Sequence, residues 1–249
     1  MKNFLKKISI ILTILIFNFS VAKAESEVEC AENLSRVFFN FNQSLDKSAI
    51  LPSAKLYNKM PIKMREMSGN FVSNIGRLLS IPTNILQGDI DGAGDNLGGF
   101  IVNTILGFGG LNDAATGLGI ENKKEDFGQV LGFWGVDNGC YFVLPLFGPT
   151  TVRDSLGMVA DRMIDPFARF SLDGQTLMLT NVNGDPADYY ITKGTGVIDF
   201  RAKNITSFDN LEKNSLDLYS SFKSLYLQDR SNKINNNSSN NGDWEEFSK

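Results

Sequence analysis

The 249-residue chain contains no histidine. Histidine is the usual general base, the usual partner of a nucleophilic serine or cysteine and the commonest metal ligand, so its absence excludes most known hydrolase and metal sites. Only two cysteines occur, and they cannot supply a zinc-binding spacing. No Walker loop is present, and the glycines of "GFGGLNDAATGLG" do not form a dinucleotide-binding motif, because Asn112 occupies the place of the third glycine. Chemistry by carboxylates or lysines stays open.

Long apolar runs are also scarce. Near the N-terminus three lysines precede an apolar run over residues 8–19, and "AKA" at residues 22–24 supplies small residues at the two positions that a signal peptidase reads. The run is about half of the roughly 20 residues that a membrane-crossing helix needs, so residues 1–24 are predicted to be a cleaved signal peptide. Cleavage removes four lysines and leaves 20 basic against 28 acidic residues, a net charge of about −8. This charge argues against a nucleic-acid partner.

The mature chain suits one compact domain over residues 25–230. Residues 231–242, "SNKINNNSSNNG", are polar and have almost nothing to bury, so residues 231–249 are predicted to be a disordered tail. At the end of this tail "DWEEFSK" places two aromatic residues among acids. Such an end can dock to a partner, although a tail without any partner fits the sequence nearly as well.

The first half of the domain contains two apolar helical patterns. Apolar residues recur at intervals of three and four from Met60 to Leu79, which predicts an amphipathic helix with Pro61 in its first turn and Pro82 at its end. The apolar stripe would pack on a soluble core in the common case, or meet a membrane. Leu97–Leu111 is apolar but for two residues and too short to span a bilayer as a helix. It fits a buried core helix, an interfacial segment or a re-entrant one.

The second half gives weaker signals. Glu125–Gly135 mixes helical and extended features, and its structure stays open. Leu172–Ile191 is rich in turn-forming residues and is predicted to hold a short hairpin. A last long helix is predicted from Asp199, as the N-cap, to Gln228, because apolar residues mark one face of that segment.

Four segments of the chain carry a family resemblance. They are "RVFFNFNQSLD" from Arg36, "NFVSNIGRLLSIPTNILQGD" from Asn70, the long stretch from Phe100 to Gly157, and "GVIDFRA" from Gly196 with "LYLQDR" from Leu225. The third is the most specific, because it holds N-T-x-x-G, E-D-F-G-Q and L-P-x-x-G-P-x-x-x-R-D in order. Through these motifs, which cover most of residues 36–230, the chain resembles the MlaA/VacJ family of the Gram-negative outer membrane.

The resemblance implies a mainly α-helical, ring-like single domain with few or no strands and an amphipathic central channel, embedded in the inner leaflet of the outer membrane. Family members remove misplaced phospholipid from the outer leaflet. They pass this outer-membrane lipid to a soluble periplasmic lipid carrier of the Mla system, and porin trimers are typical companions. The resemblance implies no covalent step, no cofactor and no metal.

Within that picture, the stretch "CYFVLPLFGPTTVRD" from Cys140 is assigned to the lipid path. One set of side chains is expected to rest against acyl chains: Phe142, Val143, Leu144, Leu146 and Phe147. A second set is expected to face a wet path for the headgroup: Thr150, Thr151, Arg153 and Asp154. A guanidinium suits a lipid phosphate, and Asp154 would hold Arg153 in place. A purely structural Arg–Asp pair at a helix start is the alternative.

Two further groups of residues are assigned by the same resemblance. The glycines that bracket "FWGVDN" can let that loop flex as a gate, or can be simple turn glycines: Gly132, Gly135 and Gly139. The aromatic residues of "FFNFNQ" are expected to contact the membrane or pack under the ring, with core packing as the alternative: Phe38, Phe39 and Phe41.

The chain departs from the family pattern at its cysteines. Relatives are usually lipoproteins with a cysteine directly after the apolar run of the signal, whereas Cys30 follows Glu27-Val28-Glu29, so an acyl anchor is not expected. Membrane attachment would then rest on apolar surface and partners. Cys30 and Cys140 both stand where relatives commonly have proline, which favours a disulfide between them in an oxidising compartment. Two buried thiols are the alternative.

Two other functional classes stay open. Asp161 and Asp165 would share one helix face at a spacing of four and could serve a carboxylate-dependent hydrolase. A soluble periplasmic interaction protein is the third class.

Overall fold

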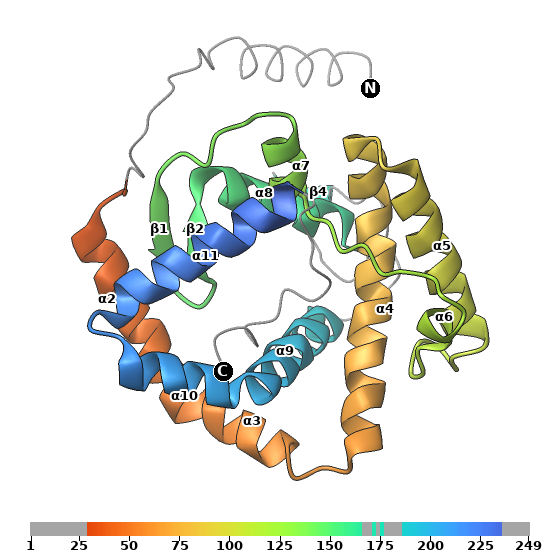
Figure 1. Cartoon of the computed structure of the whole chain (residues 1–249), viewed down its shortest axis with the longest axis horizontal. Helices are drawn as coiled ribbons and strands as arrows, with labels where there is room; N and C mark the ends of the chain where they lie inside the picture. Colours follow the sequence, from red (N-terminus) through yellow and green to blue (C-terminus); the bar gives the residue numbers. More distant parts are fainter. Residues whose placement is uncertain (1–28, 166–170, 173–174, 177–185, 236–249) are drawn as a thin grey trace.

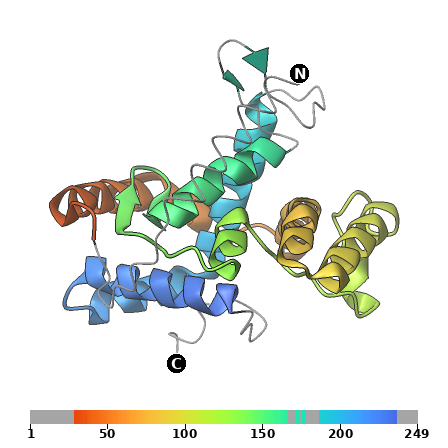
Figure 2. The same ribbon diagram turned by 90° about the horizontal axis from the view of Figure 1, so that it is seen from above.

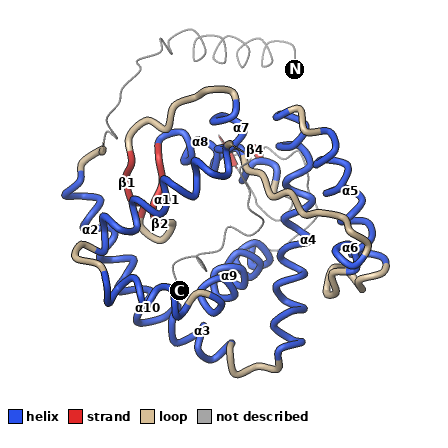
Figure 3. Tube along the Cα trace, in the orientation of Figure 1, coloured by secondary structure: helices blue, strands red, loops and turns tan. Residues whose placement is uncertain are grey.

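A computed structural model of the chain describes residues 29–165, 171–172, 175–176 and 186–235. The predicted signal peptide lies outside these ranges, as do residues 236–249 of the predicted tail. Helices dominate the described part, which confirms the predicted mainly α-helical class. Figures 1 and 3 show that they follow one another along a ring-like path, with strands confined to short pieces.

The first half of the ring consists of helices only. Helix α2 (Glu32–Leu45) continues through a π-helical turn, η1 (Asp46–Ile50), into α3 (Leu51–Tyr57). A sharp corner then leads into an antiparallel hairpin of α4 (Ile62–Gln87) and α5 (Ile90–Ile105), the most extensive helix pair of the described part. This hairpin forms one side of the ring in Figure 1.

Helix α4 is longer than the sequence predicts. Pro61 directly precedes it, as expected, but Pro82 lies inside the helix and not at its end. An internal proline costs a helix about 3 kcal/mol; here the C-terminal part of α4 packs against α5, with hydrogen bonds at Asn74 and Asn84 on either side of the proline. The helix ends at Gln87, where Gly88 adopts a φ of 82° that a glycine accommodates without strain.

The middle of the chain returns across the hairpin and builds the next side of the ring. After the short α6 (Ala114–Gly117), an irregular segment leads to α7 (Phe127–Phe133). The structure of Glu125–Gly135, which the sequence left open, is therefore mostly helical. Strands β1 (Tyr141–Leu144) and β2 (Gly148–Thr151) then pair antiparallel, and α8 (Val152–Ile164) follows directly.

The last part of the described chain contains a second hairpin and three helices. Strands β3 (Ser171–Leu172) and β4 (Gln175–Thr176) pair close to the start of the region predicted to hold a hairpin. Helix α9 (Pro186–Lys203) is followed by α10 (Ile205–Asn214) and α11 (Leu218–Ile234). Seen from above, α9 rises toward one face of the ring and α10 and α11 lie on the opposite face (Figure 2).

The single long helix predicted from Asp199 to Gln228 was therefore wrong. Asp199 lies inside α9, where its carboxylate accepts hydrogen bonds from the Tyr57 hydroxyl at 3.0 Å and from the Lys203 ammonium at 2.7 Å. The chain breaks at Asn204 and again before α11, where the Asp217 carboxylate accepts the backbone N–H of Tyr219 at 3.1 Å. Asn204 bonds to the Phe200 carbonyl at the end of α9, and Asp217 caps the start of α11, so the two residues interrupt the predicted helix. Helix α11 also extends into the predicted tail, as far as Ile234.

An aromatic core joins α2, β1 and α11. Its buried members are Phe39, Tyr141, Val143, Tyr219 and Phe222. The Phe39 ring packs edge-on against Tyr219 and Phe222, with ring centres 5.5 and 5.4 Å apart. This core holds one side of the ring by ordinary hydrophobic burial; the α4–α5 side is built differently.

Candidate functional site

Helix α4 has its polar face inside. The side chains buried along its C-terminal two thirds are all polar: Asn74, Arg77, Ser80, Thr83, Asn84 and Gln87. Their spacing of three and four residues places them on one face of the helix. The apolar residues of the same helix are largely exposed, which reverses the pattern of an amphipathic helix on a soluble core. Of the two alternatives for the Met60–Leu79 stripe, packing on a soluble core does not describe its exposed residues, Met60, Met64, Met67 and Phe71.

The buried polar face pairs with α5 through asparagines. The Asn96 amide, wholly buried, donates to Asn84 Oδ1 at 2.7 Å and to the Lys123 carbonyl at 2.7 Å. Lower on the hairpin, the Asn74 amide donates to Thr104 Oγ1 at 3.2 Å. A buried amide that lacked such partners would destabilise the fold by about 1–3 kcal/mol, so these bonds fix how the two helices face each other.

Arg77 occupies the centre of this interface. Its guanidinium, 1% exposed, donates to the carbonyl oxygens of Glu121 at 2.6 Å and Ile120 at 3.3 Å. Burial lowers the pKa of Arg77 from its ordinary value. Only a glycine fits beneath it, because a Cβ at Gly99 would lie 2.3 Å from Arg77 Nη1. The glycine in α5 therefore serves the close approach of the two helices.

The segment before α7 is fastened to α4 by the same kind of contact. The Ser80 hydroxyl accepts the backbone N–H of Glu125 at 3.1 Å, and Thr83 Oγ1 donates to the Glu125 carbonyl at 3.2 Å. Gln87 Nε2 donates to the Glu125 carboxylate at 2.8 Å. We call this set of buried contacts among α4, α5 and residues 120–125 the polar seam. It holds three segments together by hydrogen bonds rather than by apolar packing.

Outside the polar seam, the hairpin presents large apolar side chains to its surroundings. We call this surface the apolar belt: Met64, Met67, Phe71, Ile85, Leu86, Ile90, Leu97, Ile101, Ile105, Leu106 and Phe108. The largest exposed fractions are 82% at Phe108 and 70% at Ile105. Helix α5 ends at Ile105, earlier than the apolar run to Leu111 suggested, and the chain then turns. Contiguous apolar surface of this kind marks contact with a membrane or with another protein.

Across the described ranges, none of the helices combines the length and the apolar character needed to cross a bilayer.

The polar residues assigned to a wet headgroup path lie elsewhere. Thr150 and Thr151 are 1% exposed, Arg153 is 4% exposed and Asp154 is 5% exposed. The expectation that they face water was wrong. Thr151 instead begins α8, where its hydroxyl accepts the backbone N–H of Asp154 at 3.2 Å. The alternative of a structural Arg–Asp pair at a helix start is the correct description of Arg153 and Asp154.

That pair belongs to a larger ionic cluster, in which Arg153, Asp154 and Arg230 are buried and Asp126 and Tyr226 are half-buried. The Arg230 guanidinium donates to both oxygens of Asp126, at 2.6 and 2.9 Å, and to both oxygens of Asp154, at 3.0 and 3.1 Å. Tyr226 Oη donates to Asp154 at 2.5 Å. Burial alone would raise the pKa of both carboxyls, but the hydrogen bonds and the charge of Arg230 outweigh it and lower both.

The ionic cluster joins three elements that are distant in sequence. Asp126 begins α7, Asp154 lies in the first turn of α8 and Arg230 comes from α11. Two glycines let these elements approach: a Cβ at Gly128 would lie 2.6 Å from Arg230 Nη2, and one at Gly157 would lie 2.3 Å from the Gly128 nitrogen. Asp126 and Arg230 lie in the family motifs E-D-F-G-Q and L-Y-L-Q-D-R. Nothing in the spacing of these motifs indicated that the two side chains form an ion pair.

The apolar residues assigned to the membrane divide into three groups. Phe39 and Val143 are 5% and 2% exposed and belong to the aromatic core, so their assignment to lipid was wrong. They point inward because α2 and β1 pack directly on each other. Phe41, Leu146 and Phe147 are 50%, 68% and 69% exposed. The remaining three are partly buried: Phe38, Phe142 and Leu144.

The glycines of the predicted gate have different surroundings. Gly132 lies within α7, where a Cβ would come within 2.7 Å of Ile234 and 3.1 Å of Arg153 Nη1. Gly135 and Gly139 have φ values of 84° and 66°, which favour glycine. A gate in this loop stays a prediction.

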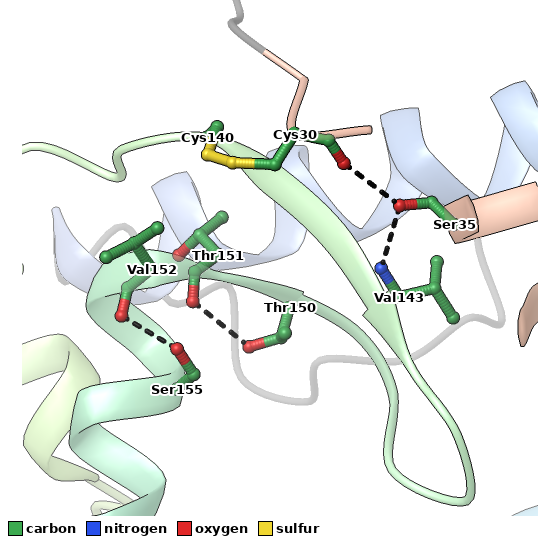
Figure 4. The surroundings of a disulfide bond; sticks show 8 residues. All are labelled: Cys30, Ser35, Cys140, Val143, Thr150, Thr151, Val152 and Ser155. Carbon is green, nitrogen blue, oxygen red and sulfur yellow. Dashed lines mark hydrogen bonds between the residues drawn. A yellow bond between two sulfur atoms is a disulfide. The ribbon is translucent and has the colours of Figure 1, made fainter. Parts of the chain in front are cut away.

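The two cysteines are bonded to each other, as predicted. Figure 4 shows Cys30, just before α2, joined to Cys140 at the start of β1. The Cys30 backbone N–H also donates to the Tyr141 carbonyl at 3.0 Å. Ser35 Oγ donates to the Cys30 carbonyl at 3.4 Å and accepts the Val143 N–H at 3.4 Å. The N-terminal segment is therefore fixed to the β1–β2 hairpin.

The two aspartates considered for hydrolysis each have a structural partner. The Asp161 carboxylate accepts the backbone N–H of Phe127 at 3.0 Å, and burial raises its pKa to about 7. Asp165 ends α8 and pairs with Lys193 at 3.0 Å. Within the described ranges, no group of histidine, cysteine or acidic side chains could hold a metal ion.

Comparison with known proteins extends these observations. Residues 28–233 match the family model of the MlaA lipoprotein. An intermembrane phospholipid transport system lipoprotein, MlaA of Haemophilus influenzae, is 30% identical over 210 residues, which cover 82% of this chain and 78% of the relative. The protein of the same name from Escherichia coli K12 is 35% identical over 138 residues, which cover 52% and 54% of the two chains.

A solved structure is similar as well. It was described in work on the structural basis for maintenance of bacterial outer membrane lipid asymmetry. It superposes with a TM-score of 0.66 at 28% identity, over 83% of this chain and 98% of the solved one. The polar seam and the ionic cluster both lie inside the matched region of the family model.

Proposed function

This chain belongs to the MlaA lipoprotein family, and from that premise we propose that it works in intermembrane phospholipid transport at the outer membrane. In this role it removes misplaced phospholipid from the outer leaflet and returns it toward the periplasm. Outer-membrane lipid asymmetry is maintained as a result.

The observation that carries the proposal is the inverted polarity of the α4–α5 hairpin. Exposing the apolar belt to water would cost about 25 cal/mol for each square ångström, whereas acyl chains remove that cost. A segment in lipid must satisfy its polar groups internally, and the polar seam does so for most of its buried groups, while Asn74 Oδ1 and Asn84 Nδ2 have no partner. Helix α5 has 16 residues and is about 24 Å long, less than the roughly 30 Å of a hydrocarbon core. The hairpin therefore suits insertion into one leaflet.

We place the lipid path at the centre of the ring. The family resemblance, which implies an amphipathic central channel, is the ground for this placement. Leu146 and Phe147, exposed at the turn between β1 and β2, are our candidates for contact with acyl chains. The buried residues of the ionic cluster do not line this path in the proposal. They hold α7, α8 and α11 together. Transport by such a path needs no covalent step, because the direction follows from where the lipid starts and what accepts it.

The partners follow from the family resemblance and are part of the proposal. A soluble periplasmic lipid carrier would accept the phospholipid, and a porin trimer would accompany the protein in the membrane. We also propose that neither cysteine carries an acyl anchor. The disulfide supports this, because it occupies the sulfur atoms of Cys30 and Cys140, the two cysteines of the sequence. Attachment would then come from the apolar belt, at about 0.8 kcal/mol for each buried CH₂.

The proposal is tested in a strain that lacks this protein. We expect phospholipid to accumulate in the outer leaflet and cells to become sensitive to detergents, and expression of the intact chain should reverse both effects. The phospholipid of the outer leaflet can be measured by labelling of intact cells with a membrane-impermeant reagent. A normal outer leaflet in the deletion strain would contradict the proposal.

A further inference from the structure

The corner between α3 and α4 exposes apolar side chains at the outer edge of the ring. In Figure 1 this corner is the turn that joins α3 to α4, away from the ring centre. The exposed apolar members of residues 55–67 are Leu56, Met60, Ile62, Met64 and Met67, with exposed fractions of 66%, 38%, 62%, 51% and 41%. Met64 and Met67 also belong to the apolar belt, so the corner continues that surface along α4.

Three lysines alternate with these apolar residues. Lys55, Lys59 and Lys63 are all exposed, and none of them forms a salt bridge within the described part of the chain. Six of the eight other lysines in the described ranges do pair with a carboxylate: Lys47, Lys123, Lys193, Lys203, Lys223 and Lys233.

The corner is basic in an acidic protein. Between residues 55 and 67 the sequence has three lysines and one arginine against a single acid, Glu66, although the whole chain has a net charge of −4. Arg65 is engaged locally, since its guanidinium donates to Asn58 Oδ1 at 2.8 Å. Unpaired positive charge is thus concentrated where apolar side chains are exposed.

We propose that this corner binds the headgroups of anionic phospholipids while its methionine, leucine and isoleucine side chains enter the acyl region. The proposal rests on the proposed function and adds a lipid class to it. Lysine stems can lie along apolar surface with their ammonium groups at headgroup height. Basic residues interspersed with apolar ones are typical of segments that lie in a membrane interface. Continuity with the apolar belt favours lipid over an acidic protein surface as the occupant.

The test compares binding of the mature chain, diluted from detergent, to vesicles of phosphatidylcholine with and without phosphatidylglycerol. We expect tighter binding to the anionic vesicles, and the difference should shrink as salt is added. Each lysine close to an anionic surface contributes about fivefold in the binding constant. The variant Lys55→Gln/Lys59→Gln/Lys63→Gln should lose at least roughly tenfold on anionic vesicles and bind phosphatidylcholine as before.

The matched control is Lys47→Gln/Lys213→Gln/Lys233→Gln, which removes the same charge from exposed lysines on other elements. It should retain the preference for anionic vesicles, as should a triple arginine variant of the corner. Equal binding of wild type and corner variant to anionic vesicles would overturn the proposal and leave a protein partner as the occupant. An equal loss in the control would also overturn it. Failure of the wild type to bind either vesicle would instead count against the proposed function.

Discussion

Replacing both Ile101 and Ile105 by aspartate should remove the protein from the outer membrane. The two side chains lie one turn apart on α5 and are 46% and 70% exposed, so their loss leaves the interior of the fold unchanged. A charged side chain at hydrocarbon depth costs about 2.5–3.5 kcal/mol, which is roughly a hundredfold in partitioning for each substitution. We expect the double variant to shift from the outer-membrane fraction to the soluble periplasmic fraction and to fail to restore lipid asymmetry.

Leu216→Asp is the control for this experiment. Leu216 lies fully exposed in the linker between α10 and α11, beside Asp217 and outside the apolar belt. A charge placed there should change neither fractionation nor lipid asymmetry. If the double variant on α5 stayed in the outer membrane with full activity, the apolar belt could not be the surface that meets lipid.

Replacing Arg230 by methionine should lower the free energy of unfolding by about 3 kcal/mol, the lower end of the cost of removing one partner of a buried ion pair. Arg230 bonds two carboxylates, of which Asp154 is buried and keeps Arg153 as a second partner, while Asp126 is 37% exposed. Such a loss is a large share of the stability of an ordinary domain. The change can be measured by denaturation in mild detergent, followed by circular dichroism.

The pH dependence of the same variant gives a second reading. In the wild type the pKa values of Asp126 and Asp154 lie below the ordinary carboxyl value, so their stabilising effect is present above about pH 4 and is lost as the pH falls. Without Arg230 both pKa values should be lowered less, although Arg153 and Tyr226 still bond Asp154. The variant should therefore lose less stability than the wild type as the pH falls below about 4.

Arg36→Met serves as the matched control for the ionic cluster. Arg36 also makes two hydrogen bonds to a carboxylate, that of Asp217, at 3.1 and 2.8 Å. Both side chains are more than a third exposed, so solvent weakens the pair and the expected loss is below about 1 kcal/mol. A similar loss in the free energy of unfolding for Arg36→Met and Arg230→Met would show that the ionic cluster stabilises the fold no more than an exposed ion pair does.

The sequence predicted the helical class through the family resemblance of its motifs, and the disulfide because its two cysteines stand where relatives commonly have proline. It did not predict which way the polar residues face. Thr150 and Arg153 follow an apolar stretch, and adjacency in sequence does not distinguish a water-filled path from a buried helix start. The partner that decides the question, Arg230, is 76 residues away from Asp154, and no local signal connects them.

The polarity of α4 illustrates the same limit. Its apolar stripe and its polar stripe are equally regular. Periodicity shows that the two stripes lie on different faces of the helix, but it does not show which face is buried. Whether the polar side turns inward depends on what covers it. Here the Asn96 amide of α5 donates to Asn84 Oδ1, and the backbone carbonyls of Ile120 and Glu121 accept hydrogen bonds from Arg77. Those contacts appear only in the folded chain.

The most direct test of the central claim, that the apolar surface lies in lipid, uses the fluorescence of Trp134. This side chain is 70% exposed at the end of α7, and its indole N–H donates to the Leu86 carbonyl of α4 at 2.9 Å. Trp244→Phe leaves Trp134 as the single tryptophan of the chain. In vesicles with brominated acyl chains we expect strong quenching of Trp134 and little quenching by iodide in the water. Strong quenching by iodide and none by the brominated lipid would contradict the account.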